Sequence, residues 1–105
     1  MTDQPTPTTH FPVATIVKQY RKGQGLSLRD FAQQLPYEGS ISHGSVHNWE
    51  QGTHNPDYSF LMGLILHTGD WRLDFALDCL SVMRPGDYEP QTEIGRRARD
   101  QYLNK

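Results

Sequence analysis

The sequence predicts an all-α fold, with five helices in one domain and a short C-terminal helical extension. Two observations support this prediction. Residues that start or stop helices recur between short apolar runs, and the length of 105 residues suits a single domain. The apolar residues also follow the spacing of a helix rather than the alternation of a strand, as in the stripe Val13, Ile16, Val17 and Tyr20.

The first expected helix begins at Pro12, a residue that suits the first helical position, and ends at Gly23–Gly25. Residues 1–11 are rich in threonine and proline and are expected to form a disordered tail. The helical domain is therefore predicted to begin at residue 12.

Two short capped helices follow, joined by a loop over Pro36–Ser40. Ser27 is expected to cap the first of them, which runs to Leu35. Ser42 is expected to cap the second, which runs to Gln51 and ends at Gly52. In this second helix the spacing predicts that Val46 and Trp49 face inward, so the opposite side carries polar residues.

Three more helices are expected, at 58–67, 71–83 and 92–103, the first two after the capping residues Asp57 and Asp70. Pro85 and Gly86 break the chain before the last of them. We therefore predict a helix-turn-helix domain over residues 12–84 and a C-terminal extension over residues 85–105.

The segments GLSLRDFAQQL, from Gly25, and SVHNWEQG, from Ser45, resemble the second helix and the recognition helix of the phage repressor and Cro-like (XRE-like) helix-turn-helix family. The segment THNPDYSFLMGLI resembles the part that follows, and the resemblance covers roughly Val13 to Phe75. It implies a lambda-repressor-like fold. It also implies sequence-specific binding to double-stranded DNA and regulation of transcription, which in this family is often repression.

The resemblance also implies roles for individual residues. Arg21 and Glu50 match a structural ion pair of the family. The base-reading positions fall on His43, Gly44, Ser45, His47 and Asn48, and the phosphate contacts on Ser27, Arg29, Gln51, Thr53 and His54. The sequence departs from the family in three ways: the turn over Pro36–Ser40 is longer, Leu28 stands where the family often has glutamine, and Gly44 has no side chain.

Chemistry supports the reading of bases independently of the resemblance. Asn48 can bond adenine bidentately, and His43, Ser45 and His47 can bond other base edges or phosphates. The alternative is a polar helix face that only meets solvent. The net charge is −2, and residues 1–56 carry four basic and four acidic side chains, so non-specific affinity for DNA should be weak.

The helix expected over residues 71–83 is apolar around most of its circumference. We therefore predict a homodimer interface that includes Trp71, Phe75, Cys79 and Val82, and a palindromic DNA site with one half-site for each copy. The alternative is that the tail helix folds back and covers this surface within one chain. The tail helix carries three arginines, Arg96, Arg97 and Arg99. They could contact DNA phosphates or an acidic partner, and the alternative is a basic helix face that only meets solvent.

A second function remains open: a protein-interaction module, such as an antitoxin or phage adaptor, which the acidic segment 57–89 favours. We expect no enzyme, because no catalytic triad, phosphate loop or metal signature appears. His43 and His47 have the i, i+4 spacing of metal ligands but no third ligand nearby, so no metal or other cofactor is expected. No apolar run could span a membrane and no signal peptide is visible, so a cytoplasmic location is expected.

Overall fold

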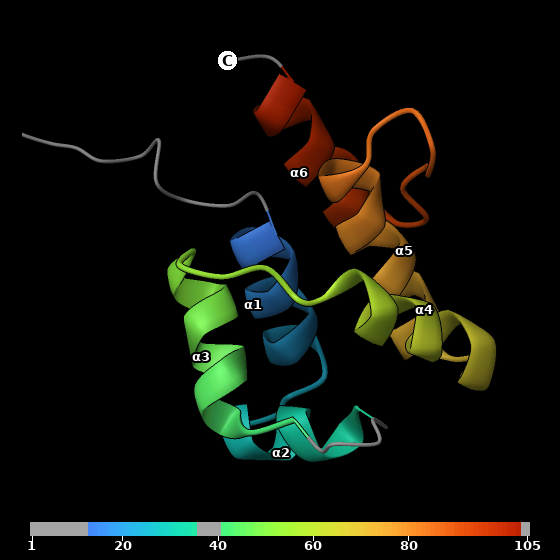
Figure 1. Ribbon diagram of the computed structural model, residues 1–105. Helices are drawn as coiled ribbons and strands as arrows, with labels where there is room; N and C mark the ends of the chain where they lie inside the picture. The colour runs from blue at the N-terminus through green and yellow to red at the C-terminus, as the bar shows by residue number, and fades with distance from the viewer. Residues whose placement is uncertain (1–12, 36–40, 104–105) are drawn as a thin grey trace, which may run out of the picture.

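The structure, a computed structural model, describes residues 13–35 and 41–103, and side chains as far as residue 101 (Figure 1). This part of the chain is helical and has no β-strand beyond an isolated bridge between Pro85 and Tyr88. Its six helices are α1 (Val13–Gly23), α2 (Leu28–Gln34), α3 (His43–Gln51), α4 (Tyr58–His67), α5 (Trp71–Met83) and α6 (Glu93–Leu103). The expected all-α class is confirmed for these ranges, while the predicted tail over residues 1–11 and loop over Pro36–Ser40 lie outside them.

Local hydrogen bonds explain where the two central helices begin and end. The Ser27 hydroxyl accepts a bond from the N–H of Asp30 at 3.1 Å, and the Ser42 hydroxyl accepts one from Ser45 at 3.1 Å. Both serines therefore cap their helices as predicted, since each satisfies one of the free N–H groups of a first turn. Gly52 ends α3 with a φ of 79°, a left-handed conformation that glycine adopts without strain.

One apolar core joins α1, α2 and α5. The predicted stripe of α1 is buried throughout, and its last member, Tyr20, meets Phe75 edge to face with 5.4 Å between ring centroids. Phe31 of α2 packs against Phe75 at 5.6 Å and against Trp71 at 5.5 Å. Aromatic pairs of this geometry add to the stability that burial provides, so these rings hold the three helices together.

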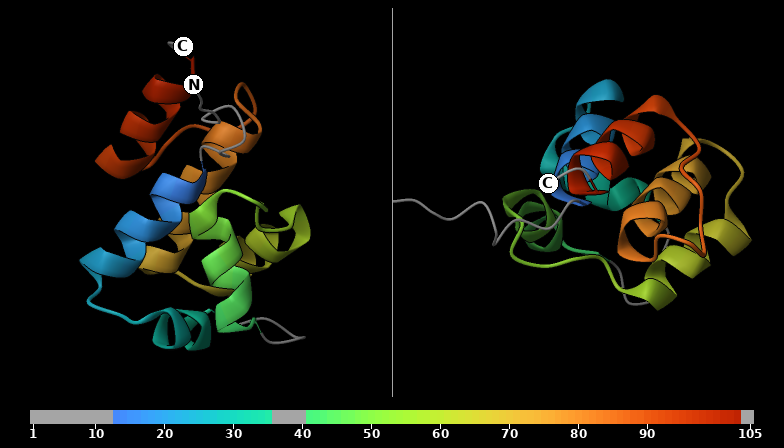
Figure 2. Two further views of the ribbon diagram at one scale, coloured as in Figure 1. Left: turned by 90° about the vertical axis from the view of Figure 1, so that its left-hand side faces the viewer. Right: turned by 90° about the horizontal axis from the view of Figure 1, so that it is seen from above.

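The helix α3 lies along one side of this core, next to α1 and α2 (Figures 1 and 2). Its inward residues are Val46 and Trp49, which are 0% and 5% exposed. The Trp49 ring packs against Phe60 of α4, with centroids 5.6 Å apart. α3 is therefore fixed on its inner side, and its outer side points away from the rest of the protein.

A buried carboxylate attaches α6 to the core. Asp78 of α5 is 0% exposed and accepts bonds from the hydroxyls of Tyr20, at 2.7 Å, and Thr92, at 2.6 Å. It also accepts bonds from the backbone N–H groups of Gln91, at 2.6 Å, and Thr92, at 3.2 Å, at the start of α6. Gly95 of α6 lies against the same carboxylate so closely that a Cβ there would overlap it. Burial and the bond from its hydroxyl to Asp78 raise the pKa of Tyr20 well above its usual value.

The predicted dimer interface on α5 is wrong for three of its four residues. Phe75 and Cys79 are 0% exposed and Val82 is 2% exposed within the single chain, while Trp71 is half-buried. The physical reason is that α5 contacts α1, α4 and α6 of its own chain. The alternative, in which the tail helix covers this surface, is the arrangement that the structure has.

Candidate functional site

The outer side of α3 is a polar surface made of its exposed residues. His43, Gly44, His47, Asn48 and Gln51 are all exposed, whereas Val46 and Trp49 on the opposite side are buried. This separation follows from the helical period, because positions three and four apart share a face. We call the five exposed residues the α3 face. Four of the five predicted base-reading positions belong to it.

An ion pair between α1 and α3 fixes the orientation of this surface. Arg21 donates from Nε to Glu50 Oε2 at 2.5 Å and from Nη2 to Oε1 at 3.1 Å, and its Nη1 bonds the carbonyl of Leu26 at 3.0 Å. The side chains are 18% and 5% exposed, so the pair is largely shielded from water. The predicted ion pair is confirmed, and the bond to Glu50 raises the pKa of Arg21. The planar guanidinium sets both distance and angle between the helices.

Ser45, the fifth predicted base-reading residue, is half-buried and already engaged. Its hydroxyl lies 3.2 Å from that of Ser42, and its N–H takes part in the cap. Thr53 is also engaged, because its hydroxyl and its N–H both bond the carbonyl of Asn48 at 3.1 Å. His54 Nδ1 in turn lies 3.2 Å from the Thr53 hydroxyl. Ser45 and Thr53 therefore help to close the two ends of α3, while Thr53 and His54 remain exposed.

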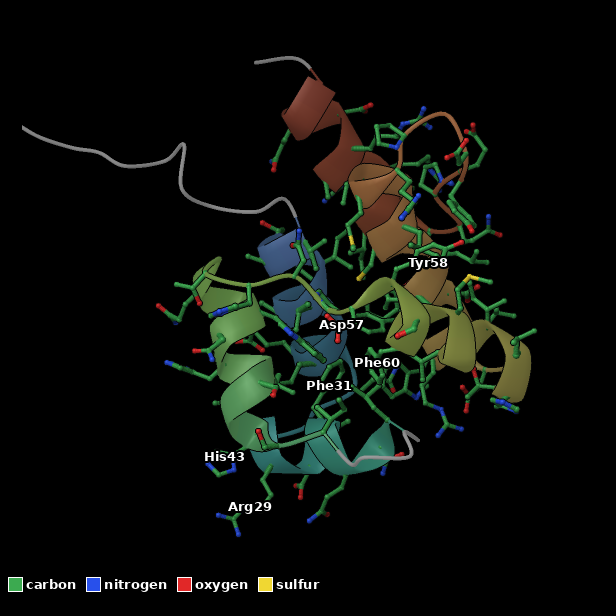
Figure 3. All side chains as sticks on the ribbon, in the orientation of Figure 1. Arg29, Phe31, His43, Asp57, Tyr58 and Phe60 are labelled. Carbon is green, nitrogen blue, oxygen red and sulfur yellow. The ribbon has the colours of Figure 1, made fainter. Side chains whose placement is uncertain are left out.

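Arg29 of α2 and His43 of α3 project from the same end of the molecule (Figure 3). Both are exposed, and Arg29 makes no ion pair within residues 13–35 and 41–101. Ser27, a predicted phosphate contact, is exposed at the start of α2, where its hydroxyl caps the helix. Lys18 of α1 lines a shallow recess beside Glu50. Few positive charges therefore lie near α3. The acid within α3, Glu50, is paired with Arg21 and does not offset them.

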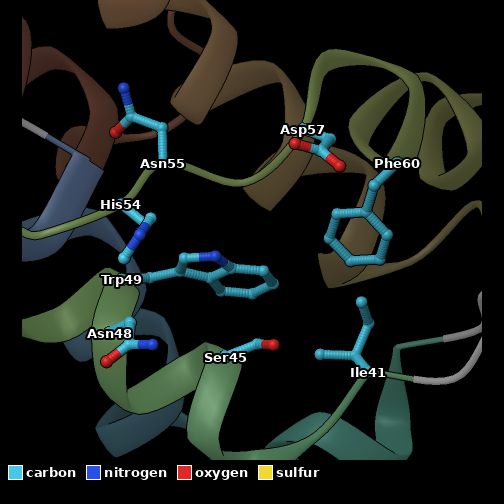
Figure 4. Close-up of a pocket in the computed structure, with 8 residues that line it drawn as sticks. All are labelled: Ile41, Ser45, Asn48, Trp49, His54, Asn55, Asp57 and Phe60. Carbon is cyan, nitrogen blue, oxygen red and sulfur yellow. The ribbon is translucent and has the colours of Figure 1, made fainter.

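A recess of about 260 Å³ opens between α3 and the start of α4 (Figure 4). Its apolar part consists of Ile41, Trp49 and Phe60, and the sequence did not point to it, because the residues come from three separate segments. Asp57 on its border is exposed and, although it stands at the start of α4, its side chain makes no capping bond. The polar lining residues are Ser45, Asn48, His54, Asn55 and Asp57.

The arginines of α6 are paired within their own segment. Arg96 and Arg97 lie 3.3 and 3.1 Å from Glu93, and Arg99 lies 3.0 Å from Glu89. Figures 1 and 2 place α6 at the opposite end of the molecule from α2. This basic cluster is therefore separated from Arg29 and from the first turn of α3.

No protein-family model, no curated protein and no solved structure matches the chain. Within the described ranges, no three histidine, cysteine or acidic side chains are grouped as metal ligands would be. None of the described helices is both long and apolar enough to cross a membrane.

Proposed function

We propose that this protein binds double-stranded DNA in a sequence-specific manner through the α3 face and regulates transcription, with repression favoured over activation. In this proposal α2 and α3 are the two helices of a lambda-repressor-like helix-turn-helix, and α3 enters the major groove. The observation that supports it best is the separation within α3: buried Val46 and Trp49 on one side, and exposed groups able to bond base edges on the other.

Within this proposal the residues have different tasks. Asn48 presents an amide that can bond adenine N6 and N7 together, and His43 and His47 present ring nitrogens to other base edges. Arg29 and Gln51 contact phosphates and set the position of the helix without reading sequence. Ser27, Ser45 and Thr53 contribute less through their hydroxyls, since those groups bond at the helix ends. His54 contributes less through its ring, because Nδ1 lies 3.2 Å from the Thr53 hydroxyl.

The sparse positive charge sets the expected strength and salt dependence of binding. If two or three phosphates are neutralised, the logarithm of the binding constant falls against the logarithm of the salt concentration with a slope of about −2 to −3.

One chain covers one half-site. A second copy on a neighbouring half-site would contact the first through a surface other than Phe75, Cys79 and Val82, which are buried.

Selection from randomised duplex DNA tests the proposal, followed by binding measurements with substituted proteins. Asn48→Ala should weaken binding to the selected duplex by about 5- to 150-fold, the loss of one bidentate base contact. Gln101→Ala is its control, an exposed amide on α6. His47→Ala should also weaken binding, with the exposed His67→Ala of α4 as its control. Failure to enrich any sequence, or equal binding by all four variants, would contradict the proposal.

The recess beside α3 supports a second candidate function, the protein-interaction module. Its apolar floor of Ile41, Trp49 and Phe60 could receive an apolar side chain of a partner. The exposed carboxylate of Asp57 on its border would repel a phosphate and favour a basic residue of that partner. A stoichiometric protein complex that is insensitive to salt would favour this function over DNA binding.

A further inference from the structure

Gly44 stands in the first turn of α3, yet none of the residues that the structure describes requires a glycine there. Among the described residues, the glycines with a left-handed backbone are Gly25, Gly52 and Gly86, and Gly44 is not one of them. Within that part of the chain, a Cβ built at Gly44 would meet one atom within 4 Å, the Ser42 hydroxyl oxygen at 3.6 Å, which is an ordinary contact. An alanine would therefore fit the folded chain without rearrangement.

The glycine has a cost for the fold. Glycine gives up more backbone freedom than alanine when a helix forms, so it weakens a helix that alanine would strengthen. A residue that costs stability and that no described neighbour requires to be glycine needs another explanation. One general use of glycine is to let the backbone come close to a ligand, where a side chain would stand in the way.

The surroundings of Gly44 indicate which ligand that is. Gly44 shares its side of α3 with His47, Asn48 and Gln51, three and four residues apart along the helix, and all four are exposed. Each of these three neighbours carries a side chain that can form hydrogen bonds with the polar edges of bases. Gly44 is thus a gap without a side chain in a row of hydrogen-bonding residues, at the end of the helix where Arg29 and His43 also project (Figure 3).

We infer that Gly44 is the point where α3 lies closest to the floor of the major groove, and that the missing side chain determines how deeply the helix enters. The inference rests on the proposed function. Carbon atoms pack no closer than about 3.5 Å, so a methyl group at residue 44 would hold the helix away from the base edges. His47 and Asn48 would then lose their bonds, because hydrogen bonds weaken steeply with distance.

Open space alone does not single out Gly44, and this supplies a matched control. Gly63 of α4 has no described atom within 4 Å of a built Cβ, and its backbone, like that of Gly44, lies outside the left-handed region. It stands between Met62 and Leu64, on a different helix from the polar row. Gly63→Ala should therefore change the stability of the fold in the same direction as Gly44→Ala without touching the groove.

The test compares the melting temperature and DNA affinity of Gly44→Ala and Gly63→Ala in the full chain. Both variants should melt about 2–5 °C above the wild type. Gly44→Ala should bind the selected duplex at least tenfold more weakly, while its affinity for an unrelated duplex stays within twofold of the wild type. Gly63→Ala should bind both duplexes as the wild type does.

Four results would overturn the inference. Unchanged affinity of Gly44→Ala for the selected duplex would show that the groove tolerates a side chain there. An equal loss on both duplexes would place the glycine against the phosphate backbone. A lower melting temperature for Gly44→Ala would mean that the fold itself needs the glycine. If the wild type prefers no duplex, the proposed function fails with it, and this result is distinguishable because it appears before any variant is made.

Discussion

Replacing Asp78 by alanine tests the attachment of α6 most severely. The carboxylate accepts four hydrogen bonds, two from hydroxyls and two from backbone N–H groups. After the substitution the hydroxyls of Tyr20 and Thr92, which lie 3.2 Å apart, can still bond each other. The N–H groups of Gln91 and Thr92 lose their acceptor. At about 1–3 kcal/mol for each unsatisfied group, the loss is about 2–6 kcal/mol.

This loss is a large part of the stability of a small domain, which is about 5–15 kcal/mol. Equilibrium unfolding in urea, followed by the fluorescence of Trp49 and Trp71, measures it. With a slope of about 1–3 kcal/mol per molar urea, the midpoint should fall by about 0.7 M or more. Asp100→Ala, an exposed acid on α6, is the control and should leave the midpoint nearly unchanged.

A midpoint for Asp78→Ala within the error of the wild type would refute the reasoning. It would mean that the buried carboxylate contributes no net stability, as happens when the cost of removing a charge from water equals the gain from its hydrogen bonds. Gly95→Ala provides an independent check on the same contact, since an added Cβ would overlap the Asp78 carboxylate. It should destabilise the fold although alanine is the better helix former.

Three further outcomes are expected. Arg21→Lys keeps the charge but loses the bidentate geometry and the bond to the backbone, so we expect a loss of about 1–2 kcal/mol in the free energy of unfolding. An unchanged free energy would show that the charge of Arg21 alone suffices beside Glu50. Ser42→Ala removes the cap of α3 and should cost about 1 kcal/mol, measured by thermal unfolding, whereas Ser59→Ala on the exposed part of α4 should cost little. Complete burial raises the pKa of the Cys79 thiol, so a thiol reagent at pH 8 should modify it only as fast as the chain unfolds. Rapid labelling of the native protein would contradict this.

Local signals explain why the helix bounds could be predicted. Ser27, Ser42 and Gly52 act on the residues next to them, so their effect is visible in a short stretch of sequence. The Arg21–Glu50 pair is not local, since it joins residues 29 apart, and was expected only through the family resemblance. The structure confirms the pair itself, with two hydrogen bonds between the guanidinium and the carboxylate.

The environment of Asp78 could not be predicted, because its partners are distant in sequence. Tyr20 is 58 residues away, and the acceptor bonds at the start of α6 span 13 and 14 residues. In the sequence, a buried acid within an apolar helix looks the same as an exposed one. Only the position of the segment that covers it distinguishes the two. The same reason explains the wrong dimer interface: the pattern of α5 requires cover, but it does not say whether the cover comes from its own chain or from a second copy.

The role of individual polar residues was predictable only in part. A serine or threonine near a helix end can serve the helix or a ligand, and its type and position are the same in both cases. The structure assigns Ser45 and Thr53 largely to the helix, whereas His47 and Asn48 remain exposed and make no side-chain bond to any described residue. Whether such a side chain bonds its own helix depends on the backbone geometry at that helix end, which spacing in the sequence does not determine.

Mapping the amide signals of the isotope-labelled protein by nuclear magnetic resonance, as the selected duplex is added, tests the central claim most directly. We predict that the largest shifts fall on His43, Gly44, His47 and Asn48, with smaller ones at Arg29. The signals of α6 should stay in place. Shifts concentrated on α6, or an unchanged spectrum with every duplex, would contradict the assignment of α3 as the helix that reads DNA.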